Sequence, residues 1–326
     1  MTEKKLIAVV GATGSQGGGL VRAILADLDQ RFAVRALTRN VQSAKAQELA
    51  AAGAEVVEAD LDDEAGVRKA FDGAHGAFVV TNYWVERTPE EEATRSRAEM
   101  ELEQAENAAR AAKDAGLRHV IWSTLEDTRE HFGDDDRVPS LDDGRYKVPH
   151  FDAKGEGNEL FTKYDVPTTF LQTTFFFEAM TMGVGPARDE SGKLVLTLPM
   201  ADQPLSGIAA EDIGKTALGV FKRGTDFIGK TVSIAGSHLT GNEYAAALTE
   251  ALGEEVVYQP LTWDQYRALG FPAAVEMANM FQFYAEDSER FTGDRDLDLV
   301  RELNPELQSF TDWLADHKNE LEAATN

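Results

Sequence analysis

The chain has 326 residues, 43% of them hydrophobic, which suits one large α/β unit with a smaller part attached. Its formal net charge of −25 disfavours direct nucleic-acid binding, because an acidic surface repels a phosphate backbone. The absence of cysteine excludes a disulfide scaffold, a thiol nucleophile and a thiolate metal site. Since no signal peptide and no apolar run long enough for a span are evident, we expect a cytoplasmic protein without a membrane segment.

The first half alternates apolar runs with helical segments. The expected strands are 6–10, 32–38, 54–59, 78–80, 119–123 and 168–173. The expected helices are 16–28, 44–52, a short one ending at 71, 90–115, and one that begins near 150. Continuous apolar runs suit strands that are covered on both faces. This order predicts an α/β fold with a Rossmann-type, doubly wound parallel sheet, whose ligand crevice lies at the carboxyl ends of the strands.

The second half is less regular. Its acidic runs predict that residues 126–148 form a solvated loop. Further strands are expected at 194–198 and 231–234, and helices at 208–221, 243–252, 273–285 and 310–321. We expect a dinucleotide-binding domain at 1–174, joined by returning segments around 206–236. Residues 175–205 and 237–326 would then form a smaller α/β domain for a substrate or partner. The apolar residues at 277–284 are expected to pack in its core, with a wall over the cofactor or a partner surface as the alternative.

A glycine motif directly follows the first strand and opens a helix. It consists of Gly11, Ala12, Thr13, Gly14, Ser15, Gln16 and Gly17. The first glycine allows a tight turn, the second lets the backbone approach a pyrophosphate, and the third permits close packing of helix on strand. The free N–H groups at the helix start favour phosphate. The motif therefore predicts binding of a nicotinamide dinucleotide.

The end of the second strand indicates which dinucleotide is preferred. An NAD site usually has a carboxylate there, whereas this chain has Arg39 and Asn40. Arginine binds a 2′-phosphate through its planar set of donors, and Ser43 and Lys45 could add a donor and a charge. We therefore expect NADP(H) in preference to NAD(H).

Further stretches carry a family resemblance over nearly the whole chain. They include Thr-Asn-Tyr-Trp at 81–84, Trp-Ser-Thr-Leu-Glu at 122–126, His-Phe-Asp-Ala-Lys-Gly-Glu at 150–156 and Ala-Asn-Met-Phe at 278–281. Together with the glycine motif and residues 34–40, they resemble the NmrA-like family of atypical short-chain dehydrogenase/reductases. That family includes NADP-binding redox sensors and regulators that act through protein partners, and it has relatives among isoflavone reductase-like enzymes.

The resemblance implies a set of cofactor contacts beyond the glycine motif. They are Arg39, Asn40, Ser43, Asp60, Leu61, Thr81, Asn82, Tyr83, Lys154, Phe176, Phe177 and Glu178. One position departs from the family, because Glu106 stands where many relatives have a lysine, and a carboxylate cannot serve a phosphate.

The catalytic machinery is incomplete. Classical members of the wider group use Tyr-x-x-x-Lys on a helix, where the tyrosine moves a proton and a serine orients the carbonyl. Here that spacing gives His150 and Lys154, and Tyr146 lies too far from the lysine. Ser123 stands at the end of the fifth strand. These three residues, His150, Lys154 and Ser123, are candidates only, and the scattered histidines predict no metal site.

The missing tyrosine favours an NADP(H)-responsive regulator that acts through a protein partner. The alternative is an NAD(P)H-dependent oxidoreductase of a small carbonyl or quinone substrate. A third possibility is an interaction protein that the dinucleotide merely stabilises. The sequence does not identify the substrate, the partner or the oligomeric state.

Overall fold

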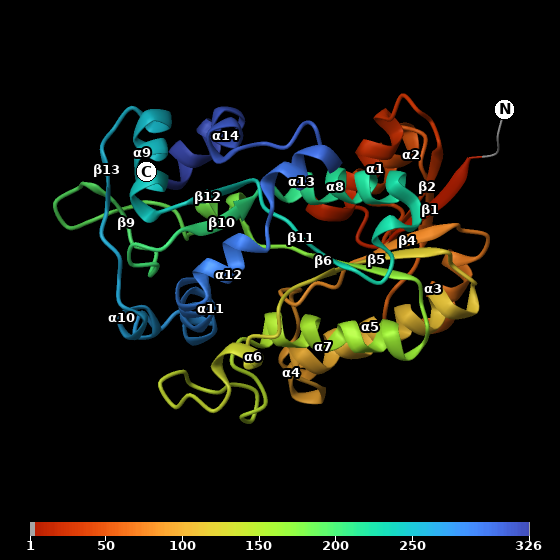
Figure 1. The fold of residues 1–326 in the computed structure, drawn as a ribbon, viewed down its shortest axis with the longest axis horizontal. Coiled ribbons are helices and arrows are strands. Elements are labelled where there is room, and N and C mark those ends of the chain that lie inside the picture. The colour runs from red at the N-terminus through yellow and green to blue at the C-terminus, as the bar shows by residue number, and fades with distance from the viewer. Residues whose placement is uncertain (1–3, 326) are drawn as a thin grey trace.

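The computed structural model describes residues 4–325. Its centre is a seven-stranded parallel sheet with the order β11-β6-β5-β4-β1-β2-β3 (Figure 1). The strands are β1 (Lys5–Val9), β2 (Phe32–Thr38), β3 (Glu55–Glu58), β4 (Gly76–Val79), β5 (His119–Thr124), β6 (Thr168–Gln172) and β11 (Thr231–Ser233). The strand order reverses between β1 and β4, which places a crevice at the carboxyl ends of these strands. The predicted doubly wound sheet is confirmed.

Helices cover both faces of the sheet, as Figure 1 shows. One face packs against α1 (Ser15–Ala26), α2 (Ala44–Ala51), α8 (Ala210–Arg223) and α13 (Leu297–Leu303). The other packs against α3 (Glu64–Phe71), α5 (Arg97–Asp114) and α7 (Pro149–Lys163). Because both faces are covered, every residue of β4 and β5 is buried, which accounts for their continuous apolar runs.

The expected helix at 90–115 is in fact two helices, α4 (Pro89–Thr94) and α5. Ser96 caps the start of α5, since its side chain accepts a hydrogen bond from the backbone N–H of Glu99 while the Glu99 side chain bonds back to the N–H of Ser96. This capping box begins a new helix inside a stretch that has helical periodicity throughout. The sequence prediction of a single helix was therefore wrong.

The smaller part contains two three-stranded sheets. One consists of β12 (Ser237–Leu239), β10 (Leu205–Ile208) and β7 (Phe175–Phe176), and the other of β13 (Val256–Tyr258), β9 (Leu194–Leu196) and β8 (Ala187–Arg188). The helical elements of this part are η1 (Phe177–Thr181), α9 (Gly241–Leu252), α10 (Trp263–Arg267), α11 (Ala274–Glu286), α12 (Ser288–Gly293) and α14 (Phe310–Thr325). The short η2 (Gly224–Phe227) follows α8 instead and lies beside β6 of the large sheet, where the carbonyl oxygen of Phe227 accepts a hydrogen bond from Thr169 at 2.9 Å. An aromatic-rich core holds this part together, and α11 contributes Met280, Phe281, Phe283 and Tyr284 to it. Those residues therefore have the packing role that the sequence favoured.

Residues 126–148, expected to be a solvated loop, are firmly anchored. They contain α6 (Arg129–Phe132), and Phe132 and Val138 are buried in the core. Nζ of Lys147 donates to the carbonyl oxygen of Val138 at 2.8 Å. The fully buried amide of Asn279 on α11 donates to the carbonyl oxygen of Lys147 at 2.7 Å. The acidic runs concealed these anchors, because each lies singly between polar residues.

One buried ion pair joins the two parts of the fold. Arg295, which follows α12, is 1% exposed and donates to Oε1 of Glu126 and to the carbonyl oxygen of Thr173, both at 2.7 Å. Glu126 and Thr173 lie within two residues of the carboxyl ends of β5 and β6 of the large sheet. Among the described residues, no helix is long and apolar enough to cross a membrane, and no group of three acidic or histidine side chains could hold a metal ion.

Candidate functional site

The glycine motif forms the turn between β1 and α1. Gly11 has a φ of +65°, a left-handed conformation that favours glycine. A Cβ added at Gly17 would lie 2.5 Å from the carbonyl oxygen of Gly11, so a side chain there would push the helix away from the turn. Gly14 is the N-cap residue of α1, and no side chain caps this end. The first N–H groups of α1 are therefore available to a phosphate.

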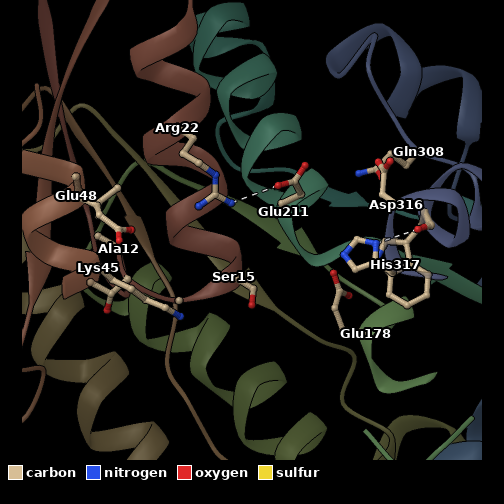
Figure 2. Close-up of a pocket in the computed structure, with 14 residues that line it drawn as sticks. Ala12, Ser15, Arg22, Lys45, Glu48, Glu178, Glu211, Gln308, Asp316 and His317 are labelled. Carbon is tan, nitrogen blue, oxygen red and sulfur yellow. Dashed lines mark hydrogen bonds and ion pairs between the residues drawn. The ribbon is translucent and has the colours of Figure 1, made fainter. Parts of the chain in front are cut away.

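A cavity of about 530 Å³ lies beside this motif (Figure 2). The predicted residues Ala12, Thr13, Gly14, Ser15 and Glu178 line it. The other lining residues are Arg22, Lys45, Glu48, Leu49, Glu211, Gln308, Trp313, Asp316 and His317. Figure 2 shows Lys45 and Glu48 on the opposite side of Ser15 from His317 and Asp316. The residues from α14 were missed by sequence reasoning, because only the fold brings them to the glycine motif.

The cations after β2 are free. Arg39 is exposed, and within residues 4–325 its side chain has no hydrogen bond or ion pair. Lys45 is also exposed without an ion pair in that range. Asn40 and Ser43 instead hold the turn, since Ser43 accepts a hydrogen bond from the first turn of α2 at 3.2 Å. In a chain with so many carboxylates, two unpaired cations next to the glycine motif favour an anionic ligand.

The predicted residues after β3 and in the loop after β4 stabilise their own loops. The carboxylate of Asp60 accepts a backbone hydrogen bond from two residues further on, at 3.0 Å, and the amide oxygen of Asn82 does the same at 3.1 Å. The carbonyl oxygen of Leu61 accepts a hydrogen bond from Asn107 on α5 at 2.8 Å. These contacts fix the edge of the crevice.

The predicted residues after β6 differ in their surroundings. Phe177 is fully buried, with its ring centroid 5.1 Å from that of Phe310, and Phe176 packs against the core between the large sheet and helices α1 and α8. Glu178 lines the cavity and accepts hydrogen bonds from the N–H of Ala210 at the start of α8. Burial raises the pKa of Glu178. Of these three side chains, only Glu178 reaches the cavity.

Glu106, the departure from the family pattern, has a structural role. Its carboxylate accepts hydrogen bonds from the hydroxyl of Tyr164 at 2.6 Å and from Nζ of Lys163 at 3.1 Å. These two hydrogen bonds lower the pKa of Glu106. The residue ties α5 to the end of α7.

Three acceptors hold the ammonium group of Lys154 at the carboxyl edge of the sheet. Nζ lies 2.6 Å from Oγ1 of Thr81, 3.1 Å from the carbonyl oxygen of Thr81 and 2.9 Å from Oε1 of Glu101. Glu101 is 1% exposed, and its Oε2 has no partner among the described residues. Thr81 lies just beyond the end of β4, so the ammonium group faces the crevice that the topology creates.

His150 lies one turn before Lys154 and is held by a carboxylate from the smaller part. Its Nδ1 lies 2.6 Å from Oε1 of Glu276 on α11, and its backbone N–H donates to the same oxygen at 2.8 Å. Oε2 of Glu276 accepts a hydrogen bond from the hydroxyl of Tyr83 at 3.4 Å. Burial, and next the charge of Glu276, raise the pKa of Tyr83, so its hydroxyl stays protonated and donates. His150 and Lys154 therefore both face segment 81–84.

Two further residues were considered from the sequence, Ser123 at the carboxyl edge of the sheet and Tyr146 before α7. Oγ of Ser123, at the end of β5, donates to Oε1 of Gln16 in the first turn of α1 at 2.7 Å. Tyr146 precedes α7 and donates to the carboxylate of Glu156 at 3.3 Å. The hydroxyl of Tyr146 therefore bonds to Glu156 and not to Lys154. Glu276 was missed by the sequence analysis, because nothing distinguishes one glutamate in an amphipathic helix.

The model of the NmrA-like family matches residues 3–314. The chain is 28% identical to an NmrA-like family domain-containing oxidoreductase, malD, of Malbranchea aurantiaca, with 96% of each protein covered. Its fold is similar to that of the negative transcriptional regulator NmrA in complex with NADP, with a TM-score of 0.75, 24% identity, and 99% of this chain and 98% of that chain covered. It is also similar to the Citrobacter triphenylmethane reductase in complex with NADP(H), with a TM-score of 0.69, 20% identity, and 98% and 99% of the two chains covered.

Proposed function

We propose that this chain, which belongs to the NmrA-like family, is an NADP(H)-dependent oxidoreductase that reduces a small carbonyl or quinone compound. The observation that carries the proposal is the convergence of Lys154 and His150 on segment 81–84, at the carboxyl edge of the sheet. This is the edge where doubly wound folds bind dinucleotides. The oxidoreductase named among its relatives supports the same activity.

The residues at this edge fit an NADP(H) molecule. The uncapped start of α1 suits the pyrophosphate, and the approach of Gly17 to Gly11 is the packing that a dinucleotide motif requires. Arg39 and Lys45 are unpaired cations that suit a 2′-phosphate. The NmrA regulator has been crystallised with NADP and with NAD, so the preference for NADP(H) in this chain rests on Arg39.

Bound NADPH would supply the hydride, and the chain's own residues would orient the reactants. Lys154 presents an ammonium group, fixed by Thr81 and Glu101, to the crevice, where it would bind the ribose of the cofactor. Ser123 and Gln16 form a hydrogen-bonded pair between the end of β5 and the first turn of α1, which can orient a polar group of a ligand. Groups fixed in this way position reactants without further loss of freedom on binding.

A second candidate function is the regulator that the sequence favours. One observation supports it. Glu276 links α11 of the smaller part to His150 in the first turn of α7, and the next turn of α7 carries Lys154. A ligand that shifts Lys154 could therefore change the surface of the smaller part, provided that it binds the two arrangements with different affinity. A protein partner would then recognise that surface.

Three measurements decide between these candidates: dinucleotide binding, turnover and capture of a protein partner. Calorimetry with NADP+, NADPH, NAD+ and NADH tests binding, and NADPH oxidation over a panel of carbonyl and quinone compounds tests turnover. Binding together with turnover supports the oxidoreductase. Tight binding with no turnover, together with cofactor-dependent capture of a protein partner, favours the regulator. Failure to bind any of the four dinucleotides would overturn both.

A further inference from the structure

The buried carboxylate of Glu276 has hydrogen-bond partners on both of its oxygens, His150 on one and Tyr83 on the other. Glu276 is 7% exposed and His150 is 6% exposed, so both side chains are shielded from bulk water. Oε1 receives the backbone N–H of His150 at 2.8 Å and faces Nδ1 at 2.6 Å, while Oε2 receives the hydroxyl of Tyr83 at 3.4 Å. A carboxylate at this distance favours a proton on Nδ1 and fixes the orientation of the ring.

The other ring nitrogen of His150 is left for a ligand. Within residues 4–325, Nε2 has no hydrogen-bond partner, and it is not among the fully enclosed polar atoms that lack one. The ring lies on segment 81–84, with centroids 5.8 Å from Tyr83 and 5.1 Å from Trp84. The Nδ1 side is thus held by the protein, and the Nε2 side can meet a substrate.

We propose that His150 is the proton donor for carbonyl reduction and that Glu276 is its positioning residue. The inference rests on the proposed oxidoreductase activity. His150 takes the place on the helix where Tyr-x-x-x-Lys enzymes have their phenol, and Glu276 supplies the negative charge that stabilises an imidazolium, as carboxylates do for histidine in other active sites.

The step balances without another reactant. A hydride, with its electron pair, passes from NADPH to the carbonyl carbon, and the electrons of the C=O π bond move to the oxygen. That oxygen takes the proton from Nε2 of His150, which gives an alcohol, NADP+ and a neutral imidazole. Nδ1 keeps its proton against Glu276, and Nε2 regains one from water.

The surroundings of the ring also indicate the body of the substrate. Trp84 is 46% exposed although it is a large aromatic residue, and its ring lies edge-on to Tyr83 at 4.8 Å. An exposed indole beside the proton donor offers a flat apolar surface. The substrate class that fits is an aromatic aldehyde or ketone, whose ring packs on Trp84 while its oxygen meets His150.

The experiment compares two substrates in three variants. Hydride addition to an aromatic aldehyde gives an alkoxide, a strong base that needs a proton at once. Hydride addition to a quinone gives a stabilised phenolate, which does not. The variants are His150→Gln, Glu276→Gln, and the control His131→Gln. His131 also pairs with a carboxylate, Glu286, at 3.4 Å, but it lies in the anchored loop. Calorimetry with NADP+ checks that each variant keeps the cofactor site.

We expect His150→Gln to lower kcat for the aldehyde by about 10²–10⁴-fold, the range for a placed acid, while kcat for the quinone falls much less and NADP+ affinity changes little. Glu276→Gln should lower kcat for the aldehyde less than that and leave KM nearly unchanged, and His131→Gln should resemble the unmodified protein. In addition, ¹⁵N NMR at alkaline pH should show the His150 proton on Nδ1.

Equal losses for both substrates in His150→Gln, no loss for either, or an imidazole protonated only on Nε2 would overturn the inference and leave the oxidoreductase standing. A protein that binds NADP+ but reduces neither substrate would overturn the proposed activity itself, and the inference with it.

Discussion

The ammonium group of Lys154 forms an ion pair at 2.9 Å with Glu101, a carboxylate that is 1% exposed. The second oxygen of that carboxylate has no partner among the described residues, so Lys154 is the only cation that neutralises it there. Lys154 therefore has a structural role in addition to the cofactor contact that the family resemblance implies. Loss of activity in a Lys154 variant would not by itself report on the cofactor.

We expect Lys154→Ala to lower the free energy of unfolding by about 3–5 kcal/mol, because it leaves an uncompensated buried charge. The same change in a Glu101→Gln background should cost much less, since no charge is then stranded. Urea denaturation of the four proteins of this double-mutant cycle measures the coupling. Additive effects would show that the two side chains do not interact.

Arg39→Ala should weaken NADP+ binding by about 1–3 kcal/mol, the range for a charge-assisted hydrogen bond, and leave NAD+ nearly unchanged. Arg118 provides a matched control, because it is also exposed but directly precedes β5, at the amino ends of the strands and away from the crevice. Arg118→Ala should alter neither affinity. Isothermal calorimetry measures both, and equal weakening of NADP+ and NAD+ in Arg39→Ala would remove the 2′-phosphate from this position.

Gly14 and Gly17 should respond differently to substitution. A Cβ at Gly14 would lie 3.2 Å from one carbonyl oxygen, whereas a Cβ at Gly17 would lie within 2.7 Å of three backbone atoms. We expect Gly14→Val to fold but to lose detectable NADP(H) binding, because the side chain occupies the path of the pyrophosphate. Gly17→Ala should lower the stability by about 1–3 kcal/mol. Thermal unfolding and calorimetry test the contrast, and intact NADP(H) binding by Gly14→Val would place the phosphates elsewhere.

Stability should fall in mild acid because of His119. This ring is 3% exposed and lies 2.8 Å from the hydroxyl of Thr169. Burial, with smaller effects from His75 and Lys5, lowers its pKa from 6.5 to about 4. Since the folded pKa is the lower one, the unfolded chain binds the proton first, and the contribution that is complete above pH 6.5 is lost as the pH falls towards 4.

The size of that loss is about 3 kcal/mol between neutral pH and pH 4, from the shift in pKa. His119→Gln keeps a side chain that can bond Thr169 but does not titrate in this range. Denaturation at several pH values measures the free energy of unfolding, which should fall by about 3 kcal/mol less in the variant than in the unmodified protein between neutral pH and pH 4. Parallel curves for the two proteins would show that His119 does not carry the acid sensitivity.

The parts of the fold that follow from local pattern were predictable. Continuous apolar runs predicted strands of the large sheet, and the glycine motif predicted the turn between β1 and α1, because both depend on neighbouring residues. The capping box at Ser96 was also legible, but a uniform helical pattern masked it. Of the short strands of the smaller part, only β9 was expected, because the others carry too few residues for a periodicity to appear.

The site was only half predictable, for a different reason. Lys154 and His150 could be paired from their spacing on one helix, whereas Glu276 contacts His150 from 126 positions away in the sequence. Contacts of that separation exist only after the chain has folded. The missing phenol made the sequence favour a regulator, and the carboxylate that contacts His150 could be seen only in the structure.

The ion pair between Arg295 and Glu126 bears on how the chain can be dissected. A fragment that ends after β6 would strand Glu126 without its arginine, and it would also lack β11 at the sheet edge and the α8 and α13 cover over α1. The half of the chain that carries the glycine motif is therefore not expected to fold without the C-terminal helices. Any transplant or fusion that aims to use it must carry the C-terminal helices along.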